Sequence, residues 1–217
     1  MSFLEILEQL AQGLGHTLLV TLTCSATALL VALVMTGLRQ LGTQKIGEVL
    51  DVFTYVFRGV PVLVLLFMVY FGLPSIGVKV SSLAAMALSL GLIAAAYLSE
   101  VFRGALQAVN VSEVLAAQAS GMSRLQVFTY IEAPQMLRFA VPGMINEFTS
   151  ILKYSPFAYT VGIPEMTKQA MNLTATTLRG IEVYLAVGIL YFGIYWILIR
   201  GVRHIEKLFR VPGIGDA

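Results

Sequence analysis

Five long apolar segments, separated by short polar stretches, dominate the chain. A helix needs about 20 apolar residues to cross the hydrocarbon core of a bilayer. Glycines and prolines occur inside several of these segments, and neighbouring helices tolerate them in a membrane. The pattern predicts an all-α integral membrane bundle of five transmembrane helices in a single domain, residues 1–217, with spans at about 17–38, 52–73, 83–102, 139–163 and 181–199.

A polar segment, residues 110–135, interrupts this pattern between the third and fourth spans. Asn110 or Ser112 can cap a first short helix, and Gly121 is placed to end it in a left-handed turn. Ser123 then begins a second helix, because Gln126 completes a capping-box pattern with it. We expect a helix–glycine–helix segment, which is either a docking point for another protein or an amphipathic connector resting on the bilayer.

The N-terminal residues are amphipathic at helical spacing. Phe3, Ile6, Leu7 and Leu10 fall on one face of a helix. This pattern predicts a short helix that either lies on the membrane surface or leads, solvated, into the first span.

The composition supports a membrane environment. Hydrophobic residues make up 58% of the chain and charged residues 12%, with a mean hydropathy of +0.83. Soluble domains carry about 25% charged residues, so the solvent of this chain must be partly lipid. The net charge of +2 gives no reason to expect a nucleic-acid partner. Cys24 is the only cysteine, which excludes an internal disulfide.

The distribution of Lys and Arg predicts the orientation, because cytoplasmic loops are enriched in these residues. One side of the predicted topology holds ten of them and the other side three, Lys79, Lys168 and Arg179. We expect the first side to be cytoplasmic, with the N-terminus outside and the C-terminus inside. The ten are Arg39, Lys45, Arg58, Arg103, Arg124, Arg138, Arg200, Arg203, Lys207 and Arg210.

Polar side chains within the fourth span are the candidate substrate pathway. Ionisable groups at membrane depth are costly and usually face a cavity or one another. Asn146, Ser150 and Lys153 share one helical stripe, with Glu147 to one side. They line a translocation path, or they are satisfied structural groups with Lys153 reaching an interface.

Two further features belong with this pathway. Pro156 makes an unbroken α-helix through Tyr154 and Ser155 unfavourable, so backbone groups there are free to contact substrate or the helix bends for packing. Arg58, at the inner end of the second span, either gates the cytoplasmic exit or anchors the helix at the interface. Glu100 and Arg103 are spaced to form an ion pair.

Several enzyme motifs are missing from the sequence. It contains no G-x-x-x-x-G-K-[ST] phosphate loop, so it is not an ATPase of that kind. It contains no H-E-x-x-H zinc motif and no G-x-S-x-G nucleophile elbow. We expect a chain that is not an enzyme and binds no cofactor or metal.

Four ordered motifs resemble those of a known family. The spacing from Gly121 through Ile131 to Pro134 is similar to the EAA loop of bacterial ABC importer permeases. Three further stretches resemble the polar amino acid (histidine, glutamine and arginine) branch of that family. They are FRGVPVLVLLFMVYFGLP at 57–74, AAYLSEVFRGALQAV at 95–109 and VPGMINEFTSILKYSPFAYTVGIPEMT at 141–167.

The resemblance implies a transport subunit of the inner membrane that imports amino acids by alternating access. It implies a separate ATPase dimer that binds ATP and Mg²⁺, a second permease subunit, and a periplasmic or lipid-anchored substrate-binding protein. The 110–135 segment would be the coupling helix that docks on the ATPase. The residues expected at that contact are Leu115, Ala116, Ala117, Gly121, Met122, Ser123, Ile131 and Pro134.

Three positions depart from the family pattern. Leu115 stands where the EAA loop commonly has Glu, and Ala133 where Leu usually precedes the proline. We therefore expect altered docking and slightly favour a non-identical second permease subunit. Tyr154 stands where an Asp often follows Lys153, which weakens the case for a basic substrate.

Two other functions remain open at this point. A self-sufficient secondary transporter or channel would use Glu147 and Lys153 as an ion relay. An assembly subunit would have no pathway of its own. Co-purification with an ATPase separates both from the importer.

Overall fold

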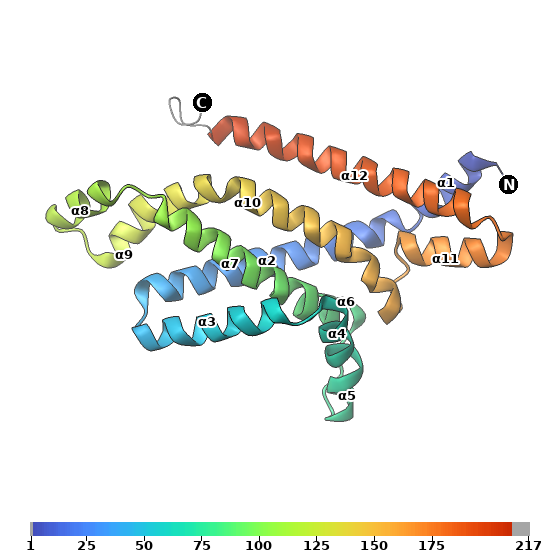
Figure 1. Ribbon diagram of the computed structural model, residues 1–217, viewed down its shortest axis with the longest axis horizontal. Coiled ribbons are helices and arrows are strands. Elements are labelled where there is room, and N and C mark those ends of the chain that lie inside the picture. Colours follow the sequence, from blue (N-terminus) through green and yellow to red (C-terminus); the bar gives the residue numbers. More distant parts are fainter. Residues whose placement is uncertain (1, 210–217) are drawn as a thin grey trace.

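The computed structural model describes the backbone of residues 2–209 and the side chains of residues 2–201, and every regular element in that part of the chain is a helix (Figure 1). The predicted all-α class is therefore confirmed. Four long helices run roughly side by side along the long axis of the molecule. They are α2 (Leu14–Leu41), α7 (Leu92–Gln107), α10 (Ala133–Tyr154) and α12 (Gly180–Phe209).

Helices α2, α7 and α10 form the centre of the bundle. Small side chains let helices in a membrane approach closely, and a Cβ added to Gly143 of α10 would clash with Cγ1 of Val101 on α7. Cys24 is free and fully buried in this core, as expected for a packing residue. Other core residues are Val20, Ala28, Leu90, Ala94, Leu98, Phe102 and Ile151.

The predicted second span is broken, not straight. Helix α3 (Gln44–Gly59) ends just before Pro61, and the chain turns by 101° into the helical stretch Val62–Ser75. Proline forces the preceding residue out of the helical region, and Val60 is extended at φ −95° and ψ 129°. The stretch beyond the turn comprises α4 (Val62–Phe67), the π-helix η1 (Met68–Gly72) and α5 (Leu73–Ser75).

The predicted third and fourth spans also differ in their bounds. The third consists of α6 (Ser82–Met86), the π-helix η2 (Ala87–Gly91) and α7. The fourth begins earlier and ends earlier than expected, because α10 stops at Tyr154 and the 3₁₀ helix η4 (Ser155–Val161) follows. The interruption predicted from Pro156 is confirmed at that junction.

The number of membrane spans differs from the expected five. Within the described residues, three helical stretches are long and apolar enough to span a membrane, Leu14–Leu41, Ser82–Gln107 and Gly180–Gly201, and the bent pair makes a fourth if it counts as one span. Helix α10 is not among them, since its polar residues lower its hydropathy. A count of five is therefore not confirmed.

The expected helix–glycine–helix segment is present at one end of the bundle (Figure 1). Asn110 caps α8 (Val111–Ala119), accepting a 2.9 Å hydrogen bond from the Ser112 N–H. Gly121 has φ +84°, the left-handed conformation that glycine adopts without steric cost. Ser123 and Gln126 form the capping box of α9 (Arg124–Val127), and the π-helix η3 (Phe128–Glu132) leads into α10.

The opposite end of the bundle holds α1 (Phe3–Ala11) and α11 (Met166–Thr177) (Figure 1). The predicted N-terminal helix is present, and its apolar face is partly buried: Phe3 stays exposed, while Ile6 and Leu10 pack inward. Ile6 and Leu10 are fully buried, packed in a cluster with Ala170, Val183 and Ala186 of α11 and α12. Whether this helix rests on the membrane surface stays a prediction.

Glu165 joins the elements at this end. Its fully buried carboxylate accepts hydrogen bonds from the N–H groups of Thr167 and Lys168, at 2.7 and 2.8 Å, and so caps α11. Tyr191 of α12 donates its hydroxyl to the same carboxylate at 3.1 Å. A Cβ on Gly13, just before α2, would lie 2.5 Å from the Met166 backbone nitrogen. This close approach holds α2 against α11.

Candidate translocation site and coupling segment

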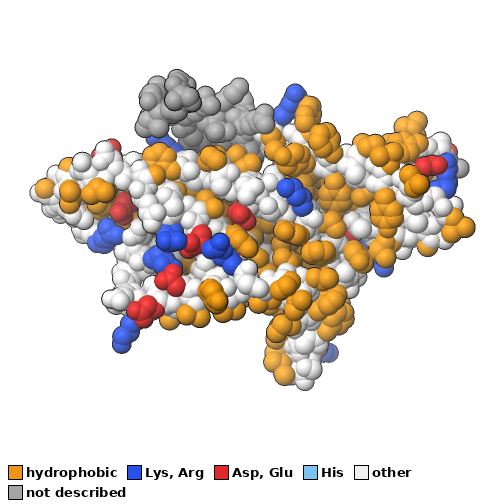
Figure 2. Space-filling model, viewed as in Figure 1, with side chains coloured by type: hydrophobic (Ala, Val, Ile, Leu, Met, Phe, Trp, Pro, Cys, Tyr) orange, Lys and Arg blue, Asp and Glu red, His pale blue; other side chains and the backbone are white. Residues whose placement is uncertain are grey.

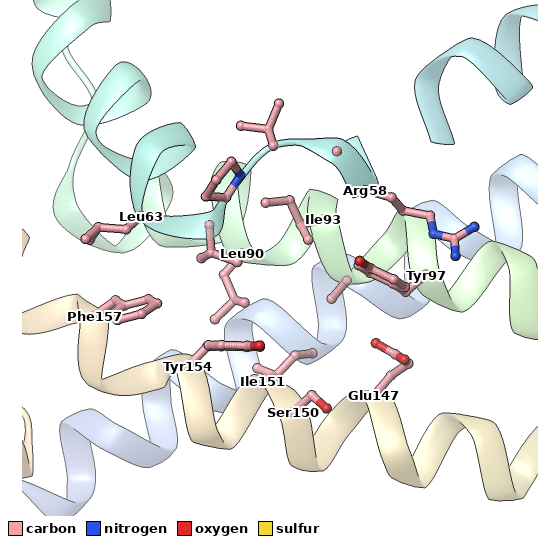
Figure 3. A pocket seen from close by; sticks show the side chains of 15 residues that line it. Arg58, Leu63, Leu90, Ile93, Tyr97, Glu147, Ser150, Ile151, Tyr154 and Phe157 are labelled. Atoms are coloured by element: carbon pink, nitrogen blue, oxygen red, sulfur yellow. The ribbon is translucent and has the colours of Figure 1, made fainter. Parts of the chain in front are cut away.

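A cavity of about 560 Å³ lies between the broken second span, α7 and α10 (Figure 3). Non-helical backbone is tolerated at membrane depth where it lines such a cavity, and here the break at 58–61 supplies part of the wall. The remaining lining is Val62, Leu63, Leu90, Ile93, Ala94, Tyr97, Glu147, Ser150, Ile151, Tyr154 and Phe157.

Two elements present matching faces to this cavity. Residues at positions i, i+3, i+4 and i+7 share one face of a helix. The third span contributes positions 90, 93, 94 and 97, and α10 contributes positions 147, 150, 151 and 154. The cavity is therefore built by ordinary helical periodicity on two sides and by the Pro61 turn on the third.

Arg58 lies at the edge of the cavity, at the end of α3. Its guanidinium carbon is 4.9 Å from the centroid of the Tyr97 ring, a cation–π geometry. Its Nη1 is 3.9 Å from Oε2 of Glu100. Glu100 in turn forms the predicted ion pair with Arg103, through two hydrogen bonds. The described contacts of the Arg58 guanidinium are therefore the Tyr97 ring and a long ion pair with Glu100.

Glu147 is half-buried and points into the cavity from α10 (Figure 3). Among the residues whose side chains the structure describes, no Lys, Arg or His nitrogen lies within 4.0 Å of its carboxylate. Ser150 donates its hydroxyl to the Asn146 carbonyl at 2.9 Å, which leaves its oxygen lone pairs available. Glu147 is therefore a charge that a ligand in the cavity can pair with.

The sequence-predicted pathway residues divide into two groups. The cavity brings together Arg58, Glu147, Ser150 and Tyr154. Asn146 and Lys153 are exposed and do not line it, although they share a helical stripe with Ser150. Any role of these two residues in transport stays a prediction.

A second cavity, of about 520 Å³, adjoins the first. The two share Arg58, Gly59 and Tyr97 as lining residues. The second cavity extends along α3 toward Asp51, which pairs with Arg39 of α2 at 2.6 Å. Arg58 and Tyr97 therefore stand at the boundary of two joined hollows that lead toward the end of the bundle carrying α8 and α9.

The charged surface of the visible face gathers at that same end (Figure 2). Lys, Arg, Asp and Glu side chains lie over α3 and the neighbouring end of α7, whereas hydrophobic side chains cover much of the middle of the bundle and the arm formed by α4 and α5. Such a division is expected of a protein with one end in water and its middle in lipid.

Sequence reasoning missed the aromatic and aliphatic part of the lining. Tyr97, Leu63, Ile151 and Phe157 face the cavity (Figure 3) but are ordinary apolar or aromatic residues in apolar segments. The available signal was Pro61, because a proline inside a predicted span marks a break, and broken helices commonly form transporter binding sites.

Most of the expected coupling residues face solvent. Leu115 is 59% exposed. Met122 and Ile131 are half-buried and Ala117 is buried, while Ala116, Gly121, Ser123 and Pro134 are exposed. Glu113 accepts a 2.7 Å hydrogen bond from Gln135, so its carboxylate is engaged within the segment. Docking of this segment on another protein stays a prediction.

Arg124 connects the 110–135 segment to the first span. Its Nη2 donates to Oε1 of Gln40 at 2.7 Å and its Nε to the Gln40 carbonyl at 3.3 Å. Its Nη1 lies 3.5 Å from Glu132, whose carboxylate is largely buried and has a second oxygen with no hydrogen-bond partner. Arg124 therefore joins α9 to the end of α2 and partly neutralises Glu132.

No metal centre is found in the described part of the chain. No three His, Cys, Asp or Glu side chains gather there closely enough to hold a metal ion. What the arrangement offers is a largely apolar cavity with Arg58 and Glu147 in its lining.

A helical bundle with apolar outer faces (Figure 2) and a partly open cavity among its helices is typical of a membrane transport subunit. The chain belongs to the family of binding-protein-dependent transport system inner membrane components, whose model matches residues 28–211. The importer permease resemblance found in the sequence is thereby confirmed.

Individual relatives agree with this assignment. The probable amino-acid permease protein YxeN of Bacillus subtilis (strain 168) is 33% identical over 92% of this chain and 89% of its own length. The probable amino-acid ABC transporter permease protein PatM of Vibrio harveyi is 30% identical over 91% of this chain and 90% of its own. A crystal structure of an amino acid ABC transporter with histidines superposes with a TM-score of 0.85 at 27% identity, covering 95% of this chain and 98% of that one.

Membership of the family fixes the general role of the chain. It is a membrane transport subunit and not an enzyme, since its relatives are permeases and ATP hydrolysis belongs to a separate subunit. The family also implies an ATP-binding subunit and a second permease as partners, and a location in the inner membrane.

Proposed function

We propose that the chain is the permease subunit of an ATP-driven importer that moves amino acids into the cytoplasm by alternating access. The observation that carries this proposal is the cavity at the broken second span, where Arg58 and Glu147 face a space inside an apolar bundle. The names of the relatives, which include amino-acid permeases, support the substrate class.

The 110–135 segment is, in this proposal, the coupling helix that docks on the separate ATPase. ATP and Mg²⁺ bind to that partner, and this chain binds no cofactor. The exposed position of Leu115 supports a contact there, and the hydrogen bonds from Arg124 to Gln40 offer a route from the contact to α2. Movement of the segment then rocks the spans around the cavity.

The remaining partners and the orientation are also part of the proposal. A periplasmic or lipid-anchored binding protein delivers the substrate, and the second permease subunit is non-identical, because Leu115 replaces the usual Glu of one coupling loop. The ten-to-three distribution of Lys and Arg supports an N-terminus outside and a C-terminus in the cytoplasm.

Family membership favours this function over a self-sufficient secondary transporter or an assembly subunit. An ion relay between Glu147 and Lys153 gains no support, since Lys153 does not line the cavity that Glu147 faces.

Purification of the intact complex tests the proposal. We expect a stoichiometric ATPase to accompany the chain, a free amino acid to be identified in the complex by mass spectrometry, and ATP hydrolysis in proteoliposomes to drive uptake of that amino acid. Uphill uptake by the purified chain alone, driven by an ion gradient, would contradict it.

A further inference from the structure

The cavity is divided by polarity into two ends. Figure 3 shows Arg58, Tyr97 and Glu147 at one end and Leu63 and Phe157 at the other. The space between them is bordered mainly by the aliphatic side chains of Leu90, Ile93 and Ile151. A ligand that fits this space must carry its charges at one end and an uncharged part at the other.

The charged end has one group of each sign, and they come from different elements. Arg58 belongs to the end of α3 and Glu147 to α10, and the two do not form an ion pair with each other among the described contacts. Glu147 has no ion-pair partner in the described part of the chain, and Arg58 reaches Glu100 only at 3.9 Å. Both groups are available to a ligand that brings its own cation and anion.

The apolar end has no described ionised group, and its polar side-chain atom is the hydroxyl of Tyr154, whose ring stacks on that of Phe157 with the centroids 5.9 Å apart (Figure 3). Leu63, Leu90, Ile93, Ile151 and Phe157 carry no hydrogen-bonding side-chain atom. An ionised side chain placed against them would lose hydration without gaining an ionised partner. The far end of the cavity therefore favours an uncharged side chain over a charged one.

We propose that this cavity selects a zwitterionic amino acid with an uncharged, largely apolar side chain. Its ammonium group pairs with Glu147, its carboxylate pairs with Arg58, and its side chain lies toward Leu63 and Phe157. This inference rests on the proposed function and specifies the substrate class for the same site. It also assigns the two charges separate tasks, which variants can distinguish.

The first test compares ligands on the purified permease–ATPase complex in nanodiscs, without the binding protein, so that the specificity of the receptor does not enter. Thermal-shift titrations use leucine, lysine and glutamate, together with 3-methylbutylamine, which lacks the carboxylate, and 4-methylpentanoate, which lacks the amine. Ligand binding to the folded state raises the unfolding temperature. We expect leucine to bind at least tenfold more tightly than lysine or glutamate.

The second test assigns the charges with two variants. Glu147→Gln should weaken binding of leucine and 3-methylbutylamine by about tenfold or more, as expected for loss of a charge-assisted contact, and leave 4-methylpentanoate unchanged. Arg58→Gln should weaken the binding of leucine and 4-methylpentanoate and leave the binding of 3-methylbutylamine unchanged. Glu8→Gln and Lys45→Gln, at exposed positions far from the cavity, are the matched controls.

The outcomes separate this inference from the proposed function. Tighter binding of lysine or glutamate than of leucine overturns the inference alone, and this comparison needs no variant. The inference is also overturned if Glu147→Gln weakens the binding of 3-methylbutylamine and 4-methylpentanoate equally. If no amino acid raises the unfolding temperature of the complex, and none is taken up in the presence of the binding protein, both the inference and the proposed function fail.

Discussion

At the scale of single residues, Glu165 links the stability of the end of the bundle that holds α1 and α11 to pH. Burial raises the pKa of its carboxyl, although the N–H groups of Thr167 and Lys168 and the Tyr191 hydroxyl act in the opposite direction. A carboxyl with a raised folded-state pKa keeps its proton to higher pH in the folded chain than in the unfolded one. Its contribution to stability is full below the unfolded value of about 4.3 and is lost as the pH rises through the folded pKa.

We therefore expect the unfolding temperature of the wild-type protein in detergent to fall more between pH 4.5 and pH 8 than that of Glu165→Gln, because the amide does not ionise. Thermal unfolding followed by intrinsic fluorescence measures it. Glu8→Gln, which removes an exposed carboxylate, should keep the wild-type profile. Parallel profiles for the wild type and Glu165→Gln would contradict the raised pKa.

The residues of the cavity were predictable only where their chemistry was unusual. Glu147 and Ser150 were predicted because polar groups are rare inside a span, and Tyr154 because it stands where an Asp often follows the lysine. All three line the cavity, whereas Asn146 and Lys153, predicted on the first ground, do not. Ile151 also lines the cavity but carries no such signal. Which side of α10 faces inward depends on α7 and the Pro61 turn, and the sequence of α10 alone does not contain that information.

At the scale of elements, Gly13 fixes how α2 meets α11. A methyl group there would lie 2.5 to 2.7 Å from backbone atoms of Glu165 and Met166, which no side-chain rotation relieves. We expect Gly13→Ala to lower the free energy of unfolding by about 1–3 kcal/mol, the usual cost of overpacking. Denaturant titration in mixed micelles measures this loss. Gly15→Ala, where a Cβ would meet nothing within 4 Å, is the control and should not destabilise.

The connection between α9 and α2 predicts an uncoupled variant. Arg124→Ala removes both hydrogen bonds to Gln40 and leaves the Glu132 carboxylate without its cation. We expect the assembled complex to keep its basal ATPase activity but lose most of the stimulation by substrate, measured as phosphate release in proteoliposomes. Arg138→Ala, which removes an exposed arginine of α10, should behave as wild type. Normal stimulation in Arg124→Ala would exclude this route.

Local sequence signals predicted where helices begin and end better than they predicted the angles between consecutive helices. Asn110, Gly121 and the Ser123–Gln126 box act on their immediate neighbours, and the helix–glycine–helix segment was found as expected. The 101° turn at Pro61 was missed because hydropathy continues through it. An apolar run reports that a segment avoids water, but carries little information about whether its helix is straight.

At the scale of the whole molecule, the segment expected to contact the ATPase and the cavity expected to hold substrate lie at different positions along the bundle. The segment expected to meet the ATPase lies at one end, and α1 and α11 lie at the other, with the cavity between them (Figure 1). The second cavity extends from Arg58 toward the first of these ends. The polar lining of the second cavity therefore continues from the charged end of the first cavity toward the end of the bundle where charged side chains gather (Figure 2).

This arrangement predicts which ends of the bundle face each side of the membrane. In a Cys24→Ser background, which removes the single and buried native thiol, Ala175→Cys on α11 should react with a membrane-impermeant maleimide on intact spheroplasts. Ser120→Cys should react only after permeabilisation, because we expect its end of the bundle to lie in the cytoplasm. Lys45→Cys, in the first turn of α3, should follow Ser120→Cys. The reverse pattern would invert the topology and place the coupling segment where no cytoplasmic ATPase can reach it.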